Sequence, residues 1–371
     1  MNQTRIFVDC HIFDGSFQGT TTYISGLYKE LIKDQNKHFF FAANDINKVK
    51  DIFKEASNIS YLSYSSTNKF YRLLIDIPRL VKINKIDFAH FQYIVPSFKY
   101  CKYIVTTHDI LFVDYPQYFP LLNRIKNTFL FKWSAKKSDI VLTVSEYSKR
   151  KIEEHFGIKN IYITSNAVSE EFFEPYDKKQ IELDIEHQYG LSNYIIYVSR
   201  WEPRKKHDLV LKSFVNQKLY ENYNLLFIGD TSFANKKYEE FFNALDSEIK
   251  NKIFRFKKVD FKSMLHFLRG AKAAVYPSMA EGFGIPPLES LAAKIPTITS
   301  NATAMSDFKF LSDYSFNPAN EKEFDKKLLD ILNLDESKIL DLVESLKTQY
   351  SWSKSAAIFN QAVNDYQKRN I

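Results

Sequence analysis

The sequence contains little cysteine and no long hydrophobic run. Its 371 residues include two cysteines, Cys10 and Cys101, each beside an apolar run, so buried free thiols are expected rather than a disulfide. No apolar stretch approaches the roughly 20 residues of a membrane-spanning helix. No signal peptide is evident, because residues 1–5 lead straight into a strand-like run. These absences predict a cytoplasmic protein and argue against both a secreted, disulfide-rich domain and an integral membrane protein.

Internal repeats and low-complexity segments are also missing. The chain is 45% hydrophobic and long enough for two globular domains with sizeable cores. Strand-like and helix-like segments alternate, which is typical of α/β domains. The first strands are expected at residues 6–9, 38–43 and 59–64, and the first helices at residues 20–32, capped by threonine, and 48–56. The charged segment 170–189 lacks clear periodicity and is expected to contain the domain boundary.

The net charge of +7 allows nucleic acid, anionic lipid or an anionic small ligand as a partner. The basic residues are dispersed and form no known RNA-binding or helix-turn-helix pattern, which argues against nucleic acid. Two segments, 69–85 and 123–137, interleave basic with large apolar residues at roughly helical spacing. We expect packing helices with a solvated basic face, and membrane contact is the secondary prediction.

A glycine turn that follows an apolar run and opens a helix carries the strongest chemical signal. The segment from Glu281 to Glu289 contains two glycines and two prolines. Prolines favour the first turn of a helix, and backbone N–H groups at a helix N-terminus bind anions. Glu281 falls in the turn, where it can face a neutral polyol, while Glu289 falls about one turn into the helix. The simpler interpretation is a helix stabilised by an acidic first turn.

A cluster of cations after another apolar run is the second signal. Arg200 ends this run, and Arg204, Lys205 and Lys206 open the next helix. Such residues are poor core material but suit a diphosphate group, although a solvated charged turn is the simpler interpretation. His108 ends a third run, and the carboxyl end of a parallel strand is where such folds bind ligands. A lone histidine is, however, more often structural.

Segments 281–289 and 200–205 resemble the donor site of glycosyltransferase family 4, whose members are retaining enzymes of the GT-B architecture. Two glutamates separated by seven residues form the signature of that family. The resemblance implies an α/β fold with two Rossmann-like domains facing a cleft. It divides the chain into residues 1–170, an acceptor-binding domain, and 171–351, a nucleotide-sugar-binding domain. Residues 352–371 are the C-terminal helix, which crosses back to pack on the N-terminal domain.

The resemblance also implies roles for single residues. Arg200 and Lys205 match the residues that clamp the diphosphate, and Glu281 matches the one that orients sugar hydroxyls. His108 matches a histidine that contacts the transferred sugar, and Glu289 matches the ribose ligand. The remaining residues are expected to meet the donor mainly through their backbone: Gly19, Thr20, Val259, Gly282, Phe283, Gly284 and Ile285. The chain departs from the family at Ser199, where glycine is usual, and at Lys206, where asparagine or glycine is usual.

The implied activity is transfer of a hexose from a GDP- or UDP-linked sugar to a glycan or lipid-linked acceptor. Mannose is favoured, because several segments look most like bacterial mannosyltransferases of polysaccharide or O-antigen assembly. No Asp-x-Asp pair occurs in the sequence, so no metal and no other cofactor is expected. A non-catalytic protein that binds sugar nucleotides or polyanions remains the alternative, because it would use the same cations.

Overall fold

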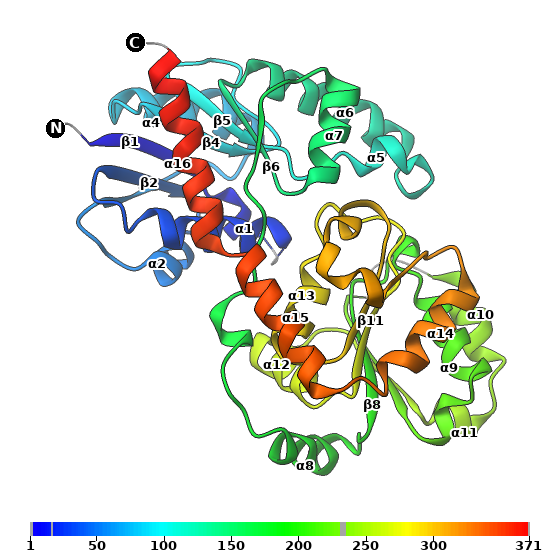
Figure 1. Cartoon of the computed structure of the whole chain (residues 1–371). Helices are drawn as coiled ribbons and strands as arrows, with labels where there is room; N and C mark the ends of the chain where they lie inside the picture. Colours follow the sequence, from blue (N-terminus) through cyan, green and yellow to red (C-terminus); the bar gives the residue numbers. More distant parts are fainter. Residues whose placement is uncertain (1–2, 16–17, 231–234, 370–371) are drawn as a thin grey trace. The chain divides into compact units, whose positions relative to one another are not determined.

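The computed structural model describes residues 3–15, 18–230 and 235–369 and divides into two compact units (Figure 1). Unit 1 comprises Met1–Ala167 together with Tyr350–Ile371, and unit 2 comprises Val168–Gln349. Each unit is built on one sheet whose strand pairs are all parallel. This confirms the predicted α/β class with two Rossmann-like domains.

The sheet of unit 1 has the strand order β3-β2-β1-β4-β5-β6-β7. Its strands are mostly buried and therefore read as apolar runs rather than alternating patterns. Their bounds are β1 (Thr4–Asp9), β2 (Lys37–Ala43), β3 (Ile59–Ser63), β4 (Phe88–Gln92), β5 (Lys102–Thr106), β6 (Ile140–Thr143) and β7 (Ile161–Ile163).

The helices of unit 1 connect these strands, and one more arrives from the end of the chain. The connecting helices are α1 (Gly19–Leu31), α2 (Ile46–Phe53), α3 (Lys69–Tyr71), the π-helix η2 (Arg72–Asp76), α4 (Ile77–Ile83), α5 (Leu111–Asp114), α6 (Leu121–Lys137) and α7 (Glu146–Phe156). The additional helix is α16 (Trp352–Arg369), red in Figure 1, which packs against α1 and β7. The Trp352 ring lies so close to Gly26 of α1 that a Cβ atom there would overlap it.

The sheet of unit 2 has the order β10-β9-β8-β11-β12-β13. Its strands are β8 (Tyr194–Val198), β9 (Asn224–Ile228), β10 (Ile253–Phe256), β11 (Ala273–Tyr276), β12 (Thr297–Ser300) and β13 (Ser315–Phe316). Its α-helices are α8 (Lys178–Tyr189), α9 (His207–Asn216), α10 (Lys236–Asn243), α11 (Ser247–Lys250), α12 (Phe261–Arg269), α13 (Ile285–Ala292), α14 (Glu321–Ile331) and α15 (Glu336–Gln349).

The strand order indicates, for each unit separately, where a ligand is expected to bind. In unit 2 the order reverses at β8, which lies between β9 and β11, and in unit 1 it reverses at β1, between β2 and β4. In open parallel sheets, ligands bind outside the carboxyl ends of the strands at this switch point. The loops after β8 and β11 are therefore where a ligand of unit 2 is expected.

The structure bears on the cysteines and on the question of membrane-spanning helices. Both cysteines are free thiols, but only Cys10 is fully buried, while Cys101 is half-buried. In the part of the chain that the structure describes, no helix combines the length and the apolar character needed to cross a membrane.

Candidate functional site

The loop after β8 is fixed by its contacts with the end of β9. The Ser199 N–H donates to the Ile228 carbonyl over 2.8 Å, and the Trp201 N–H donates to the Asp230 carbonyl over 2.9 Å. A Cβ atom at Gly229 would overlap the Ser199 carbonyl oxygen, so glycine is required for this close approach. The loop then forms the short 3-10 helix η5 (Pro203–Lys205), which carries two of the predicted cluster's cations.

The turn after β11 is fixed in a similar way. The Glu281 N–H donates to Thr303 Oγ1 over 2.8 Å. Gly284 precedes α13 with φ of 97°, a left-handed conformation that favours glycine, and a Cβ atom there would press on the Met305 side chain. Two prolines then occupy the first turn of α13, as the sequence predicts. The turn thus places Glu281 at the carboxyl end of the central strands.

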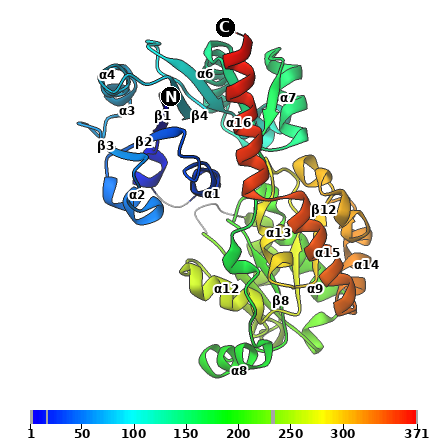
Figure 2. The same cartoon turned by 60° about the vertical axis from the view of Figure 1, so that its left-hand side comes forward.

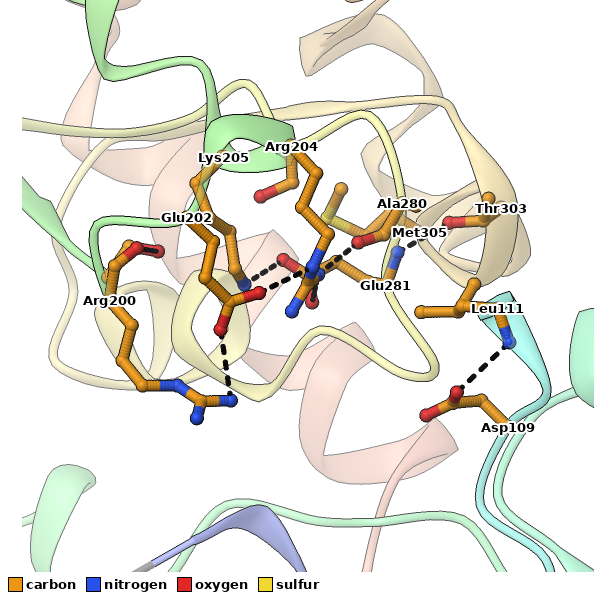
Figure 3. Close-up of polar contacts among 12 residues, drawn as sticks. Asp109, Leu111, Arg200, Glu202, Arg204, Lys205, Ala280, Glu281, Thr303 and Met305 are labelled. Atoms are coloured by element: carbon orange, nitrogen blue, oxygen red, sulfur yellow. Dashed lines mark hydrogen bonds and ion pairs between the residues drawn. The ribbon is translucent and has the colours of Figure 1, made fainter. Parts of the chain in front are cut away.

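Five charged side chains of alternating sign connect these two loops (Figure 3). Arg200 Nη2 lies 3.2 Å from Glu202 Oε1, and Glu202 Oε2 accepts from Arg204 Nε over 2.7 Å. Arg204 Nη1 lies 3.2 Å from Glu281 Oε2, while Lys205 donates to Glu281 Oε1. Of the predicted site residues, the structure therefore brings Arg200, Lys205 and Glu281 into one network.

Burial and charge oppose each other at Glu281. Burial by itself would raise the pKa of this carboxyl, but the charges of Lys205 and Arg204 outweigh it and lower the pKa to about 2. Burial also lowers the pKa of Lys205, and the attraction of Glu281 counteracts that effect. Glu281 is thus ionised at neutral pH, and each of its two oxygens pairs with a different cation.

Arg204 belongs to the cation cluster seen in the sequence, but its individual role appears only in the structure. Its side chain is only 10% exposed, and besides the two glutamates it donates to the Ala280 carbonyl. Arg200, by contrast, is 59% exposed on its side chain. Arg204 therefore holds the two loops together, whereas Arg200 has the freedom to meet a ligand. A periodic alternation of sign at positions 200, 202 and 204 is the sequence signal that could have indicated this arrangement.

Glu289 lies in α13 and is half-buried. Its carboxylate makes no hydrogen bond or ion pair within the described part of the chain, and burial raises its pKa to about 7. A carboxylate in such surroundings is stabilised by ligand groups that donate hydrogen bonds, as a pair of vicinal hydroxyls does. Residues 282–284 lie in the turn between Glu281 and α13, and Ile285 is the first residue of that helix.

His108 follows β5 in unit 1 and is 6% exposed. Its Nε2 lies 2.6 Å from the Gln92 side-chain oxygen, which accepts only, so the proton is on Nε2. The Gln92 amide nitrogen lies 3.3 Å from His90 Nε2, and His90 Nδ1 is 2.8 Å from the Tyr28 hydroxyl. Burial lowers the pKa of His108 to about 3. The imidazole is therefore neutral and oriented through Gln92, a partner that the sequence analysis did not assign.

The other predicted site residues are placed as follows. Gly19 and Thr20 open α1, which is capped by Gln18 together with Thr21 rather than by Thr20. Val259 follows β10, and this edge strand is separated from β8 by β9. These three residues take no part in the charged network drawn in Figure 3. Among the residues described, no group of three or more His, Cys, Asp or Glu side chains is arranged to hold a metal ion.

Two family models match the chain on either side of the predicted boundary. The model described as Glycosyltransferase Family 4 matches residues 17–172, and the one described as Glycosyl transferases group 1 matches residues 179–347. The O-antigen chain mannosyltransferase RfbU of Salmonella typhimurium is 30% identical over 62% of this chain and 61% of its own length. The O-antigen chain mannosyltransferase B of Escherichia coli is 23% identical over 80% of this chain and 78% of its own.

A solved structure agrees in fold. Sucrose-phosphate synthase from Thermosynechococcus elongatus is 15% identical and superposes with a TM-score of 0.74, covering 99% of this chain and all of its own. At this identity the similarity concerns the fold alone, which is that of the GT-B glycosyltransferases. The match to the Salmonella protein spans 61% of that protein's length. With both family models matched in order and the GT-B fold present, the chain belongs to the glycosyltransferases of family 4.

Proposed function

We propose that the protein transfers a hexose from a nucleotide diphosphate sugar to a hydroxyl group in the assembly of a cell-surface polysaccharide. The observation that carries this proposal is the charged network at the carboxyl ends of β8 and β11, where Glu281 is held between Lys205 and Arg204. Mannose is the favoured sugar, because the two named relatives are O-antigen mannosyltransferases. The nucleotide is proposed to be GDP or UDP.

Arg200 and Lys205 hold the diphosphate in this proposal. As the bond between sugar and phosphate breaks, negative charge grows on the departing diphosphate, so fixed cations stabilise the transition state more than the ground state. Arg200 is exposed enough to reach a ligand, and Lys205 is buried beside Glu281. The backbone N–H groups of residues 282–285 at the N-terminus of α13 complete the phosphate site.

Glu281 and Glu289 hold the two sugars of the donor. Glu281 is ionised at neutral pH and can accept hydrogen bonds from hydroxyls of the transferred hexose, and Glu289 can accept from the ribose. His108 contacts the hexose as a neutral imidazole. Its pKa of about 3 makes it a poor base at neutral pH, so the acceptor proton passes to the departing phosphate oxygen, with retention of configuration.

The proposal includes transfer without a metal ion. The two cations and the helix N-terminus supply positive charge where a metal would otherwise neutralise the diphosphate. The acceptor is a glycan or a lipid-linked glycan, and we place the enzyme in the cytoplasm with peripheral contact to a membrane. Chelation by EDTA is accordingly expected to leave both donor binding and turnover unchanged.

Ligand-dependent melting temperature and turnover test the proposal together. Wild type and Glu281→Ala are mixed with GDP, UDP and ADP and with their hexose conjugates, in the presence of EDTA. One nucleotide should raise the melting temperature, its sugar conjugate should raise it further, and Glu281→Ala should lose the additional shift. Release of the nucleotide in the presence of acceptor then measures transfer. A shift without release would support a non-catalytic binding protein, and no shift with any nucleotide would refute the proposed donor site.

A further inference from the structure

Exposed apolar side chains gather on two helical segments of unit 1. Of fifteen large apolar side chains that are exposed in the described part of the chain, nine belong to these segments. The most exposed are Leu122 at 80% and Phe70 at 73%. The nine are Phe70, Tyr71, Leu74, Ile75 and Ile83 of α3–η2–α4, and Leu121, Leu122, Ile125 and Phe129 of α6. We call them, with the exposed cations of the same helices, the basic apolar face.

The charges of this face are all positive. Helix α6 contains five basic residues and neither Asp nor Glu. The segment α3–η2–α4 contains one acid, Asp76, which is fully buried and accepts hydrogen bonds from Ser65. The exposed cations are Lys69, Arg79, Lys82, Lys126 and Lys136. A partner of the face must therefore combine negative charge with an apolar interior.

The two segments pack against one core. Both pack their buried sides into the same core cluster, with Leu73 and Ile77 from one and Phe131 from the other. Figure 2 shows α3, α4 and α6 in the same unit. Burial lowers the pKa of the Lys69 ammonium in α3, and the charges of Arg72 in η2 and of Lys126 in α6 lower it further.

A hollow of about 600 Å³ lies along α6. Apolar side chains line most of it, including Phe112, Ile125 and Phe129, while Arg124, Lys132 and Lys136 supply its cations. Apolar walls bordered by cations match a lipid, whose acyl chains are apolar and whose headgroup can be anionic. A nucleic acid would neutralise the cations but would leave the aliphatic side chains without an apolar partner. A second copy of the chain would bring like charges together.

We propose that the basic apolar face of α3–η2–α4 and α6 docks the protein onto a bilayer that contains anionic lipid. The apolar side chains enter the boundary between headgroups and acyl chains, and the surrounding lysines and arginines contact the phosphates. This inference names the surface that would make the peripheral membrane contact proposed above. It does not depend on the sugar transfer, because all the residues concerned belong to unit 1 and none has been placed in the donor site.

Vesicle sedimentation with the full-length protein tests the docking. Wild type should sediment with vesicles of phosphatidylcholine and phosphatidylglycerol, release from them at high salt, and stay in solution with phosphatidylcholine alone. The charge variant Lys126→Glu/Lys136→Glu should bind at least about 30-fold more weakly, given roughly fivefold for each cation. The apolar variant Leu122→Ser/Phe129→Ser should also release from the anionic vesicles.

Matched changes on the exposed α8 of unit 2, Lys179→Glu and Leu183→Ser, should leave vesicle binding unchanged. The nucleotide-dependent melting shift of every variant should equal that of wild type, which separates a failure of docking from a failure of the donor site. Equal binding of wild type and face variants, or no binding by wild type, would overturn the inference. The inference would also be overturned if wild type, but not the face variants, formed a dimer in light scattering. The same holds if wild type, but not the face variants, bound single-stranded RNA in place of vesicles.

Discussion

Arg200 and Arg204 are four positions apart and both pair with Glu202, yet they differ in what surrounds them. The Arg204 guanidinium is buried between two carboxylates and the Ala280 carbonyl, whereas most of Arg200 is exposed. Removing a buried partner leaves other charges unpaired, while an exposed ion pair contributes little to folding. Arg204 thus stabilises the two loops of the site, whereas Arg200 is exposed enough for the proposed contact with a ligand.

We expect Arg204→Met to lower the free energy of unfolding by about 2–4 kcal/mol, because Glu281 and Glu202 each lose a buried charged partner. Arg200→Ala should change it by no more than about 0.5 kcal/mol and should reduce turnover by about a hundredfold. Urea unfolding and initial-rate measurements on both variants check the contrast. Equal loss of stability in the two variants would contradict the distinction between them.

The pH dependence of donor binding should depend on Glu289. Its pKa of about 7 means that the folded protein must lose a proton there before the carboxylate can accept from a ribose. Affinity for a nucleotide sugar should therefore rise by about tenfold from pH 6 to pH 8. Glu289→Gln should bind more weakly and nearly independently of pH. Calorimetric titration at several pH values, with a nucleotide sugar whose diphosphate does not titrate in this range, measures the effect.

The pH dependence of the free energy of unfolding, measured without ligand, tests the raised pKa of Glu289 independently. A carboxyl whose pKa is raised on folding binds its proton more tightly in the folded state, so stability falls as pH rises from about 4.5 to about 7. Glu289→Gln should remove this part of the pH dependence. A wild-type profile identical to that of the variant would contradict the raised pKa.

The sequence singled out three members of the charged network but not the residues that support them. Arg200, Lys205 and Glu281 could be singled out because charged residues directly after apolar strands have few structural roles. Arg204 was not distinguished from its neighbours, because burial depends on the folded loops and not on residue type. Gln92 was missed as the partner of His108, although Gln92 ends β4 and His108 follows β5, and the pairing of these strands brings their ends together.

At the scale of elements, strands were easier to predict than helices. The strand expected at residues 38–43 is β2, which begins one residue earlier, because a buried parallel strand is a continuous apolar run. Residues 178–189 form α8, although they show no clear periodicity. Only Ile181 and Ile185 of this helix are buried, and Asp177 caps its start by accepting from the Gln180 N–H. Helices of this kind depend on caps and tertiary contacts that the hydrophobic pattern does not reveal.

The contact between α1 and α16 should tolerate no added atom at Gly26. Alanine in a helix usually stabilises relative to glycine, but here its Cβ atom would overlap the Trp352 ring. We expect Gly26→Ala to destabilise the protein by about 1–3 kcal/mol. Trp352→Ala removes the overlap, so the double variant should be no less stable than Trp352→Ala alone. Thermal unfolding of the three variants completes this double-mutant cycle.

The whole molecule consists of one continuous and one discontinuous unit. Residues 168–349 contain every strand of the second sheet, while the first unit needs residues 350–371 in addition to 1–167. The chain therefore passes from unit 1 to unit 2 and back. The predicted division at residue 170 rested on the charged segment 170–189, and the one at residue 351 rested on Trp352 and the final helical pattern.

Residues 168–349 should fold when produced alone and should still raise their melting temperature with the donor nucleotide, since the charged network lies entirely within them. Residues 1–167 alone should be unstable, and a linker to residues 350–371 should restore cooperative unfolding. Circular dichroism melts of the three fragments provide the measurement. A stable, cooperative 1–167 fragment would contradict the need for α16.

Because unit 1 is discontinuous, its two parts are synthesised at different times. Residues 1–167 leave the ribosome well before Phe359 of α16, which packs against the buried Tyr28 and His90 of the first unit. At typical elongation rates this delay lasts on the order of ten to forty seconds. During that time the nascent first unit has an uncovered aromatic surface, whereas the second can complete its fold. The docking of α16 is thus the step that covers this aromatic surface and completes the first unit.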